Sequence, residues 1–471
     1  MNYSKLILFW LLLLAPFASS SQYLKVSDNG RFLVKDDGSP FFLMADTGWE
    51  MFHRLDRSDI DFYLKTRHEQ GFNVIQCVIL SEINGLTVPN REGNLPLVDL
   101  DPTKPNEAYF ELVDYAVEKA AKYGMYLALL PTWGAHAEDK AHGLFENLNI
   151  FTVKNAKKYG QFLGKRYKNN WNVVWVLGGD RPAGDNMQLW NEMAAGLNTG
   201  NKNKQLIAYH PAGKQTSTTW FKDSDWLDFH ICQTGHYQPG FPVYEWIEQD
   251  YQVQPTKPVL NGEPAYEDIG IWFNPINGRY DAFQIRTYAY WSVFAGAFGH
   301  TYGNNNVWQM YREEYKGIIA PNMTWDKALD RPGANQMKYL RQLMESRPFT
   351  SRIPDQSLIL KDRKKHIEPK STDHVRVTRD GTPNNKDATY IMAYLPYHKN
   401  VEFETSVIPG SKLNVSWYDP RTGKTVSTET IPNTGFLSHT AWSGKVKPAD
   451  GGPDWVLVID DAEKGYVMPR Q

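Results

Sequence analysis

Short apolar segments and longer amphipathic segments alternate from about residue 40 to about residue 345, and no other feature constrains the possible folds as strongly. The short segments are rich in Val, Ile and Leu, as expected for strands buried on both faces of a sheet. The longer segments carry apolar residues three and four positions apart. In 106–123, for example, Phe110, Val113, Val117 and Ala120 fall on one face. The pattern therefore predicts strands that alternate with helices.

Eight strands are predicted, and their number favours a closed barrel. They are Phe41–Ala45, Val74–Leu80, Tyr126–Leu130, Val173–Leu177, Leu206–Tyr209, Asp228–Cys232, Pro258–Leu260 and Gly299–Tyr302. Helices are predicted over 106–123, 151–167 and 281–297, and from Pro332 through Met344. Eight units in which a helix follows a strand form a parallel (β/α)8 barrel.

Two further segments extend this barrel. Residues Leu24–Val34, with Asp28-Asn29-Gly30 at their centre, predict a hairpin that caps the bottom of the barrel. After about Arg352, short strand-like segments are separated by turn residues and no helices intervene. These segments are Leu358–Leu360, Val375–Val377, Thr389–Leu395, Val401–Glu404, Leu413–Trp417 and Trp455–Ile459. We therefore predict an α/β fold, with a (β/α)8 TIM barrel over 22–352 and a small C-terminal antiparallel β-sandwich over 353–471.

The first 21 residues have the composition of a secretory signal peptide. Lys5 provides the positive start, Leu6–Leu14 form an apolar run, and small residues follow at Ala18–Ser21. The run is shorter than the about 20 apolar residues that a membrane-spanning helix requires. We expect cleavage near Ser21 or Gln22 and a secreted or periplasmic protein that is not inserted in the membrane.

Charge and cysteine content exclude some partners. The net charge is −2 and Lys and Arg do not cluster, so we expect no nucleic-acid partner. Cys77 and Cys232 fall on the second and sixth predicted strands, which lie across the barrel from each other. Two buried free thiols are therefore expected rather than a disulfide. We also expect a monomer.

Polar and aromatic residues follow almost every predicted barrel strand. The carboxyl ends of the strands meet at one mouth of a TIM barrel, where active sites are built. The candidate substrate contacts at these ends are Asp46, Trp49, Trp133, His136, Arg181, His210, His236, Tyr237, Tyr302 and Trp308. The tryptophans are expected to form apolar walls, and the polar residues to bind hydroxyl groups.

Two carboxylic acids stand out among these strand ends. Asp180 follows the fourth strand and Glu263 the seventh, each after one or two glycines that allow the backbone to turn sharply. Hydrolysis of a glycosidic bond needs two carboxyl groups, of which one protonates the leaving oxygen. The other attacks the anomeric carbon or activates water. His236 or Tyr237 is expected to donate a hydrogen bond that keeps Glu263 ionised.

Three motifs resemble glycoside hydrolase family 140. They are Met44-Ala45-Asp46-Thr47-Gly48-Trp49, Trp175-Val176-Leu177-Gly178-Gly179-Asp180 and Asn261-Gly262-Glu263-Pro264. The segment 416–423 resembles the β-sandwich, described as collagen-binding, that usually follows such a barrel. The resemblance covers essentially the whole mature chain. It implies an apiosidase that releases the branched pentose apiose from side chains of the pectin rhamnogalacturonan-II. The catalytic Asp and Glu of the family match Asp180 and Glu263.

The layout also resembles the retaining barrel glycosidases with catalytic carboxylates after strands four and seven. That group has Asn-Glu after strand four, whereas this chain has Gly179-Asp180. We expect retention, with Asp180 as acid/base and Glu263 as nucleophile. The separation of the carboxyl groups decides the outcome, since roughly 5–5.5 Å gives retention and roughly 6.5–9.5 Å gives inversion.

Several alternatives stay open on the sequence alone. In the first alternative, the barrel acts on another plant or microbial polysaccharide linkage, as another furanosidase or an endo-glycanase. In the second, the protein is a non-catalytic binder of carbohydrate or collagen. Whether the enzyme trims ends or cuts chains is also open, although we expect exo action. A metal hydrolase is disfavoured because strand one lacks His-x-His and no His-Glu-x-x-His occurs. We expect no metal and no cofactor, and we expect the sandwich to support the barrel structurally.

Overall fold

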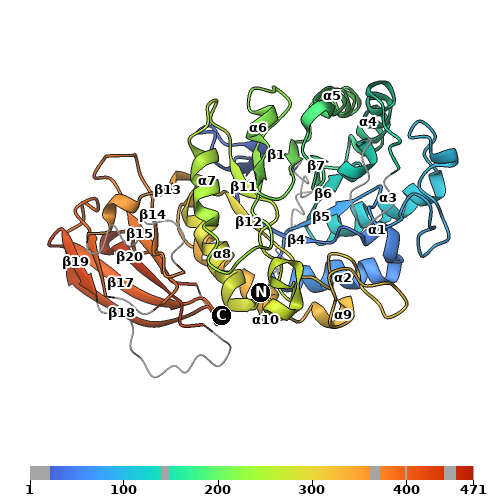
Figure 1. Cartoon of the computed structure of the whole chain (residues 1–471). Coiled ribbons are helices and arrows are strands. Elements are labelled where there is room, and N and C mark those ends of the chain that lie inside the picture. Colours follow the sequence, from blue (N-terminus) through green and yellow to red (C-terminus); the bar gives the residue numbers. More distant parts are fainter. Residues whose placement is uncertain (1–21, 139–147, 361–371, 398–399, 440–451, 470–471) are drawn as a thin grey trace, which may run out of the picture.

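The computed structural model describes residues 22–138, 148–360, 372–397, 400–439 and 452–469. Eight parallel strands form the centre of the larger domain, with helices around them (Figure 1). These strands are β4 (Leu43–Thr47), β5 (Val74–Val78), β6 (Tyr126–Leu130), β7 (Val173–Gly178), β8 (Ile207–His210), β10 (His230–Gln233), β11 (Val259–Asn261) and β12 (Gly299–Tyr302). The predicted signal peptide over 1–21 lies outside the described residues.

Backbone hydrogen bonds close these strands into a barrel. One ladder runs in the order β12-β4-β5-β6-β7-β8, and β10 pairs in parallel with β11. Asp228 N donates to Ile207 O at 2.9 Å beside β8, and Phe298 N donates to Val259 O at 3.0 Å beside β11. These two contacts connect the ladder to the β10–β11 pair on both sides. The predicted barrel is confirmed, with strand bounds that differ by a few residues.

Helices follow the strands and form the outer layer. They are α1 (Met51–Arg54), α2 (Arg57–Glu69), α3 (Glu107–Lys122), α4 (Val153–Tyr167), α5 (Met187–Asn201), α6 (Thr218–Phe221), α7 (Val243–Tyr251), α8 (Ala282–Phe294), α9 (Trp325–Ala328) and α10 (Pro332–Glu345). Asp56, Thr152 and Asp281 begin α2, α4 and α8 with capping boxes, which satisfy backbone N–H groups at the helix start. The four helices predicted from apolar spacing are α3, α4, α8 and α10.

A small antiparallel sheet covers the bottom of the barrel, opposite the carboxyl ends of the barrel strands. It consists of β1 (Leu24–Val26), β2 (Leu33–Lys35) and β3 (Pro40–Phe41). Gly30 has a φ of 68° in the turn between the first two strands, which favours glycine. Leu24 and Leu33 meet the barrel residues Ala45 and Val74 around a small apolar cavity. The predicted hairpin is thus extended by a third strand.

The C-terminal domain is a β-sandwich. One sheet has the order β13 (Ile353–Pro354), β14 (Arg376–Arg379), β15 (Tyr390–Leu395), β20 (Trp455–Asp461), β17 (Lys412–Asp419) and β18 (Lys424–Pro432). A pair of strands, β16 (Val401–Glu404) and β19 (Phe436–His439), lies over it. A strand predicted at Leu358–Leu360 was wrong, because a 3-10 helix occupies 356–358 and Ile359 forms only an isolated bridge with Phe403.

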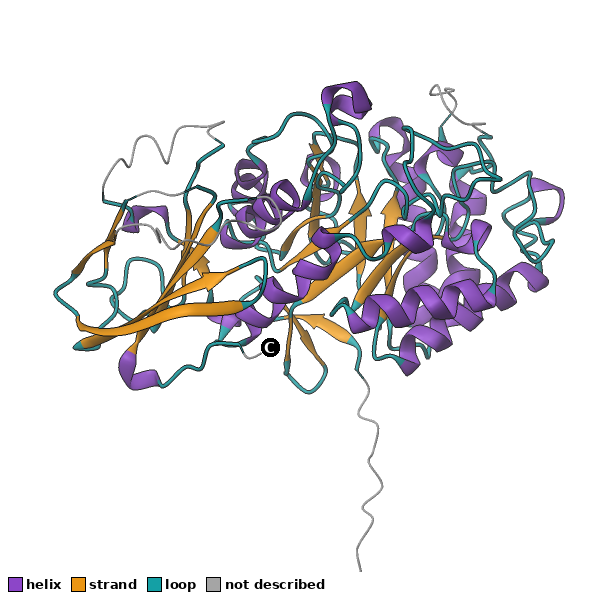
Figure 2. Ribbon diagram, turned by 90° about the horizontal axis from the view of Figure 1, so that it is seen from below, coloured by secondary structure: helices purple, strands orange, loops and turns teal. Residues whose placement is uncertain are grey.

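The large sheet of the sandwich packs on both faces. One face forms the core of the sandwich with residues such as Ile391 and Leu457. The opposite face belongs to the barrel core, where Tyr394 stacks on Tyr290 of α8 with ring centroids 4.7 Å apart. Figure 2 shows this sheet beside the helices of the barrel. The barrel core therefore extends onto one face of this sheet, whereas the interior of the sandwich forms a separate apolar cluster.

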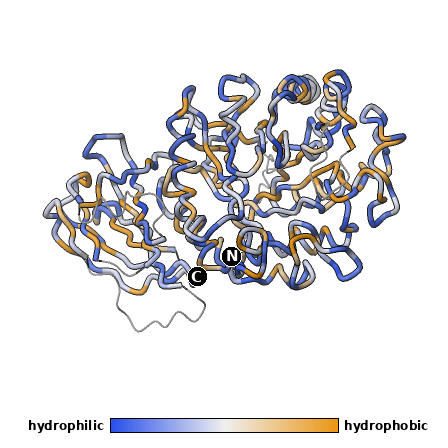
Figure 3. The backbone as a smooth tube through the Cα atoms, in the orientation of Figure 1, coloured by the Kyte–Doolittle hydropathy of each residue, from blue (hydrophilic) through white to orange (hydrophobic). Residues whose placement is uncertain are grey.

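Hydrophobic segments lie mainly along the strands of both domains, and hydrophilic segments dominate the outer loops (Figure 3). Cys77 on β5 and Cys232 on β10 are buried free thiols, as predicted. None of the described helices combines the length and hydropathy needed to cross a membrane.

Candidate active site

A cavity of about 420 Å³ opens at the carboxyl ends of the barrel strands. Its lining combines acidic, basic and aromatic side chains. The lining residues are Trp49, Glu82, Trp133, Asp180, Arg181, His236, Glu263, Tyr266, Ile269, Phe273, Trp308, Ile318 and Ile319. Asp180 and Glu263 are thus brought together in one cavity, as are five of the ten predicted substrate contacts, namely Trp49, Trp133, Arg181, His236 and Trp308.

The turn after β7 places Asp180 in the cavity. Gly178, Gly179 and Asp180 have φ values of 80°, 122° and 51°, a left-handed run that only glycine adopts freely. A Cβ on Gly178 would lie 2.5 Å from His210 O, and one on Gly179 would lie 2.8 Å from the Trp133 ring. A non-glycine residue held at positive φ is typical of functional sites, and here it is Asp180.

Polar neighbours fix the Asp180 carboxylate. Gln233 Nε2 donates to Oδ1 at 3.0 Å, and Arg181 Nη1 donates to Oδ2 at 3.1 Å. The side chain keeps 38% of its surface exposed, so it is accessible from the mouth. Enclosure in the cavity and the nearby charge of Glu263 raise the pKa of Asp180 above its usual value, although Arg181 opposes this. Asp180 is therefore the carboxyl that more readily holds a proton.

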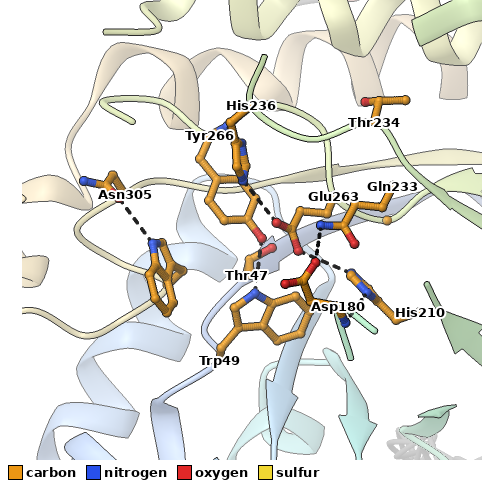
Figure 4. A network of polar contacts seen from close by, with 12 residues as sticks. Thr47, Trp49, Asp180, His210, Gln233, Thr234, His236, Glu263, Tyr266 and Asn305 are labelled. Carbon is orange, nitrogen blue, oxygen red and sulfur yellow. Dashed lines mark hydrogen bonds and ion pairs between the residues drawn. The ribbon is translucent and has the colours of Figure 1, made fainter. Parts of the chain in front are cut away.

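Two histidines fix the Glu263 carboxylate instead (Figure 4). His236 Nε2 lies 3.1 Å from Oε1, and His210 Nε2 lies 3.4 Å from Oε2. Tyr266 N donates to His236 Nδ1 at 3.2 Å, so the ring proton of a neutral His236 resides on Nε2 and points at Glu263. Burial by itself raises the pKa of Glu263. The contacts with His210 and His236 outweigh this effect and lower the pKa to about 2.

The two carboxyls therefore differ in how readily they hold a proton, since the pKa of Asp180 is raised and that of Glu263 is lowered. Figure 4 shows them side by side, with Gln233 and His210 on one side and His236 and Tyr266 on the other. A pair of carboxyl groups whose pKa values are moved apart can divide the roles of acid and nucleophile. This is the arrangement that cleavage of a glycosidic bond requires.

Aromatic rings form the walls of the cavity. Trp49 and Trp133 meet at 5.3 Å between ring centroids. Trp49 Nε1 donates to Tyr266 Oη at 3.2 Å, and Trp308 Nε1 donates to Asn305 Oδ1 at 3.3 Å, which fixes both indole rings. Such rings cover the apolar C–H faces of a sugar.

The Arg181 guanidinium, next to Asp180 in the lining of the cavity, has two further acidic neighbours. Arg181 lies 3.6 Å from Glu82 and 3.5 Å from Glu138. Burial, opposed by Arg181, raises the pKa of Glu82 to about 8, so Glu82 is protonated at neutral pH. Asp180 and Glu138 then remain as the acidic neighbours of Arg181.

Three predicted substrate contacts are buried and do not line the cavity. Asp46 is fully buried and accepts hydrogen bonds from Tyr63 Oη and Arg67 Nε, both at 2.6 Å. Tyr302, the register partner of Asp46, donates to Glu267 at 2.6 Å. Asp46 and Tyr302 are therefore absent from the cavity lining, and both side chains bond to protein partners. His136 is also buried, with Nε2 3.1 Å from Ser81 O.

Two more predicted contacts occupy positions around the cavity. His210 is buried behind Glu263 and contacts that carboxylate. Tyr237 lies on the rim, where its ring meets Trp272 at 5.2 Å, and it is His236 that bonds Glu263. Sequence reasoning did not single out Gln233, Tyr266, Glu82 or Phe273. Gln233 is the last residue of β10, a position that suggests a role, but nothing in the sequence indicates that Glu82 turns into the cavity.

Within the described ranges, no group of three or more His, Cys, Asp and Glu side chains is arranged to hold a metal ion. The histidines next to Glu263 serve as hydrogen-bond partners of a carboxylate.

Comparison with known proteins agrees with this geometry. The family model described as "Apiosidase-like, catalytic domain" matches residues 27–351, and the one described as "Putative collagen-binding domain of a collagenase" matches residues 353–460. No curated protein sequence matches significantly.

Two solved structures are similar over almost the whole chain. One, titled a glycoside hydrolase, is 32% identical with a TM-score of 0.83 and covers 95% of this chain and 99% of its own. The other, titled a glycoside hydrolase family 5 from Bacteroides vulgatus ATCC 8482, is 32% identical with a TM-score of 0.84 and covers 95% of each chain. The protein is thus a glycoside hydrolase, and its chain belongs to the family of apiosidase-like catalytic domains.

Proposed function

We propose that the protein is a retaining, exo-acting apiosidase of glycoside hydrolase family 140 that acts on rhamnogalacturonan-II side chains of pectin. The observation that carries the mechanism is the opposite environment of the two carboxyls. Glu263 is held ionised by His210 and His236, whereas the pKa of Asp180 is raised by enclosure and by Glu263. Family membership supports the choice of substrate.

In the first step, a Glu263 carboxylate oxygen forms a bond to the anomeric carbon while the glycosidic C–O bond breaks. Asp180 gives its proton to the leaving oxygen. In the second step, Asp180 takes a proton from water, whose oxygen attacks the same carbon and releases Glu263. Gln233 and Arg181 orient Asp180 for both proton transfers.

The walls of the cavity favour a small sugar. Trp49 and Trp133 stand beside glycine turns, and Gly179 touches the Trp133 ring so closely that a Cβ there has no room. Apiose is a five-membered ring with a branched hydroxymethyl group. A hexopyranose in a pocket fitted to it would leave polar groups unpaired, at a cost of about 1–3 kcal/mol each.

Product analysis tests this function. The purified enzyme should release free apiose from rhamnogalacturonan-II side chains, as measured by chromatography, and should leave cellulose, xylan and mannan intact. Glu263→Gln is the matched inactive control, and EDTA should not change the rate. Release of another monosaccharide or of oligosaccharides would show that the protein is a glycosidase with a different substrate. A rate lost in EDTA and restored by zinc or calcium would contradict the mechanism.

We also propose that the chain is exported with cleavage of residues 1–21 and works as a secreted or periplasmic monomer. The apolar run and the small residues after it support this. The sandwich then acts as a support, because one face of its large sheet is buried against the barrel. N-terminal sequencing of the exported protein should find Gln22 or a residue next to it. In a collagen pull-down, the protein should stay in the unbound fraction if the sandwich only supports the barrel. Retention of the protein on collagen would contradict that role.

A further inference from the structure

A second cavity lies at the opposite end of the barrel from the two carboxyls. Its volume is about 640 Å³, compared with about 420 Å³ for the cavity at the mouth. Leu206 and Asp228 line it just before β8 and β10 begin, so it opens at the amino ends of the strands. We call it the lower cavity, and its polar and aromatic lining includes Tyr23, Asp36, Asn198, Lys204, Trp226 and Asp228. Its volume is within the range of small-molecule sites, about 300–1,000 Å³.

Two aromatic rings in the lower cavity are held in fixed orientations. Trp226 Nε1 donates to Asn191 Oδ1 at 2.8 Å, and the Trp226 ring meets Phe221 at 4.9 Å between ring centroids. Tyr23 Oη donates to Lys168 O at 2.9 Å. Both aromatic side chains are only partly buried. Because their polar atoms are bonded to the protein, the rings offer the cavity an apolar surface of the kind that covers the C–H face of a sugar.

Polar groups beside these rings have hydrogen-bonding capacity that the protein does not use. Ile207 N donates to Asp228 Oδ2 at 2.7 Å. Among the residues that the structure describes, no hydrogen bond reaches Asp228 Oδ1, the Asn198 side chain or the Lys204 ammonium. Lys204 Nζ instead lies 5.7 Å from the centroid of the Tyr23 ring. A carboxylate, an amide and an ammonium group together can accept from and donate to hydroxyl groups.

Helix α5 keeps the lower cavity open. Asn191, Ala195 and Asn198 fall on one face of the helix, and the small Ala195 leaves space between the two amides. After the helix, Lys202 and Asn203 have φ values of 62° and 55°, and Asn203 lines the cavity. Glycine is the usual residue in such a turn. Asn203 therefore keeps a polar side chain at the cavity in a conformation that favours glycine.

The charges of the lining indicate which carbohydrates fit. Three carboxyl groups, on Asp36, Asp225 and Asp228, stand against two ammonium groups, on Lys25 and Lys204. The lower cavity thus has no excess of positive charge that would attract a polyanion. Its aromatic rings and unpaired polar groups complement a neutral sugar instead.

We propose that the lower cavity is a second carbohydrate site, which binds a neutral hexopyranose chain of a polysaccharide away from the point of cleavage. Trp226 stacks on the C–H face of one sugar ring, and Asn198, Lys204 and Asp228 bond the hydroxyl groups. Binding here keeps the enzyme on the polymer and takes no part in hydrolysis.

Affinity electrophoresis tests this site. The probes are soluble β-1,4-galactan, which is neutral, and homogalacturonan, which is acidic. The exported chain carrying Glu263→Gln is run in native gels that contain one polysaccharide, and dissociation constants follow from its mobility at increasing polysaccharide concentration. Galactan should retard the protein, and homogalacturonan should not. Trp226→Ala should weaken galactan binding about tenfold, because the stacking surface is lost. Ala195→Arg fills the lower cavity and leaves both rings in place, so it should weaken binding at least as much.

Two matched controls lie outside the lining of the lower cavity. Phe62→Ala removes an aromatic ring that is 49% exposed on α2, and Gln188→Arg adds an arginine at an exposed position in the first turn of α5. Both should bind galactan like the parent chain. Thermal unfolding of each variant shows whether a loss of binding comes from a loss of fold.

The outcomes separate this site from the mouth of the barrel. Galactan that does not retard the parent chain, or cavity variants that bind galactan as tightly as the parent, would overturn the second site. Equal retardation by homogalacturonan would overturn its preference for neutral chains. If the expected pattern appears but pectic side chains yield no apiose, the lower cavity stands as a carbohydrate site and the proposed substrate fails.

Discussion

At the scale of single residues, the environment of each carboxyl decides its role more than its chemical type. Glu263 accepts hydrogen bonds from imidazole rings, whereas Asp180 accepts from an amide and from Arg181 and shares the cavity with a second negative charge. We expect these neighbours to set the pH range in which the enzyme is active.

The basic limb of the pH profile should belong to Asp180. A general acid must be protonated, so kcat/KM falls as pH rises through the raised pKa of Asp180. Glu263 must be ionised, so the acid limb lies near its pKa of about 2. Asp180→Asn should lower kcat by roughly 10²–10⁴ on a natural substrate and abolish the basic limb.

An activated aryl apioside provides the control for that prediction. Its leaving group needs little protonation, so Asp180→Asn should slow its first step far less, whereas Glu263→Gln should slow both substrates alike. Equal losses on both substrates in Asp180→Asn would remove Asp180 from the role of acid.

His236→Phe should weaken the nucleophile. Without the Nε2 hydrogen bond, the pKa of Glu263 rises, and the acid limb of kcat/KM moves to higher pH than in the wild type. A hydrogen bond to a charged group contributes about 1.5–3 kcal/mol, so the rate should fall roughly tenfold to a hundredfold. His236→Gln, which keeps a donor, should recover part of it. An unchanged acid limb in His236→Phe would show that His236 does not act on Glu263.

At the scale of elements, the turn between β7 and α5 positions the acid. Gly179→Ala would place a methyl group against the Trp133 ring at a φ of 122°, so it should destabilise the fold by about 1–3 kcal/mol. It should also lower kcat up to a hundredfold, because a displacement of about 1 Å at a catalytic group costs that much. Thermal unfolding and steady-state kinetics measure the two effects.

Gly184→Ala is the control for this turn. Gly184 also has a positive φ, but a Cβ there meets nothing within 4 Å. It should leave kcat close to that of the wild type. An equal loss of kcat in both variants would mean that backbone conformation in general, and not the contact with Trp133, places Asp180.

At the scale of the whole molecule, a buried ion pair joins the two domains. Arg286 on α8 donates to both carboxylate oxygens of Asp454, at 2.9 and 2.7 Å, and both side chains are fully buried. Asp454→Ala leaves the guanidinium buried without this partner and should cost about 3–5 kcal/mol of unfolding free energy, measured in guanidinium chloride. Both domains should still unfold in one transition, because one face of the large sandwich sheet is buried in the core of the barrel.

The double variant Arg286→Met with Asp454→Leu should recover much of that loss, since two apolar side chains replace both charges. Activity below the unfolding transition should stay near that of the wild type in both cases, because the ion pair is remote from the cavity lining. A double variant as unstable as Asp454→Ala would show that the junction between the two domains requires the ion pair itself.

The sequence by itself determined the order of strands and helices and identified the two candidate catalytic carboxyls, because both depend on local patterns. Buried parallel strands such as 173–178 are continuous apolar runs, and glycines before Asp180 and Glu263 mark where such strands turn into the mouth. The polar strand β18 was missed because its Thr, Ser and Glu residues face solvent and lack the apolar alternation of a half-buried strand.

Only the tertiary structure decided which strand-end residues face the cavity and how each carboxyl is charged. A shift of one residue along a strand reverses the direction of its side chain, so Asp46 at a strand end bonds Arg67 of α2 and does not line the cavity. Glu82, Tyr266 and Phe273 reach the cavity from segments outside the strands, whose paths depend on contacts distant in sequence. The pKa difference between Asp180 and Glu263 likewise arises from neighbours on other strands, which no local pattern records.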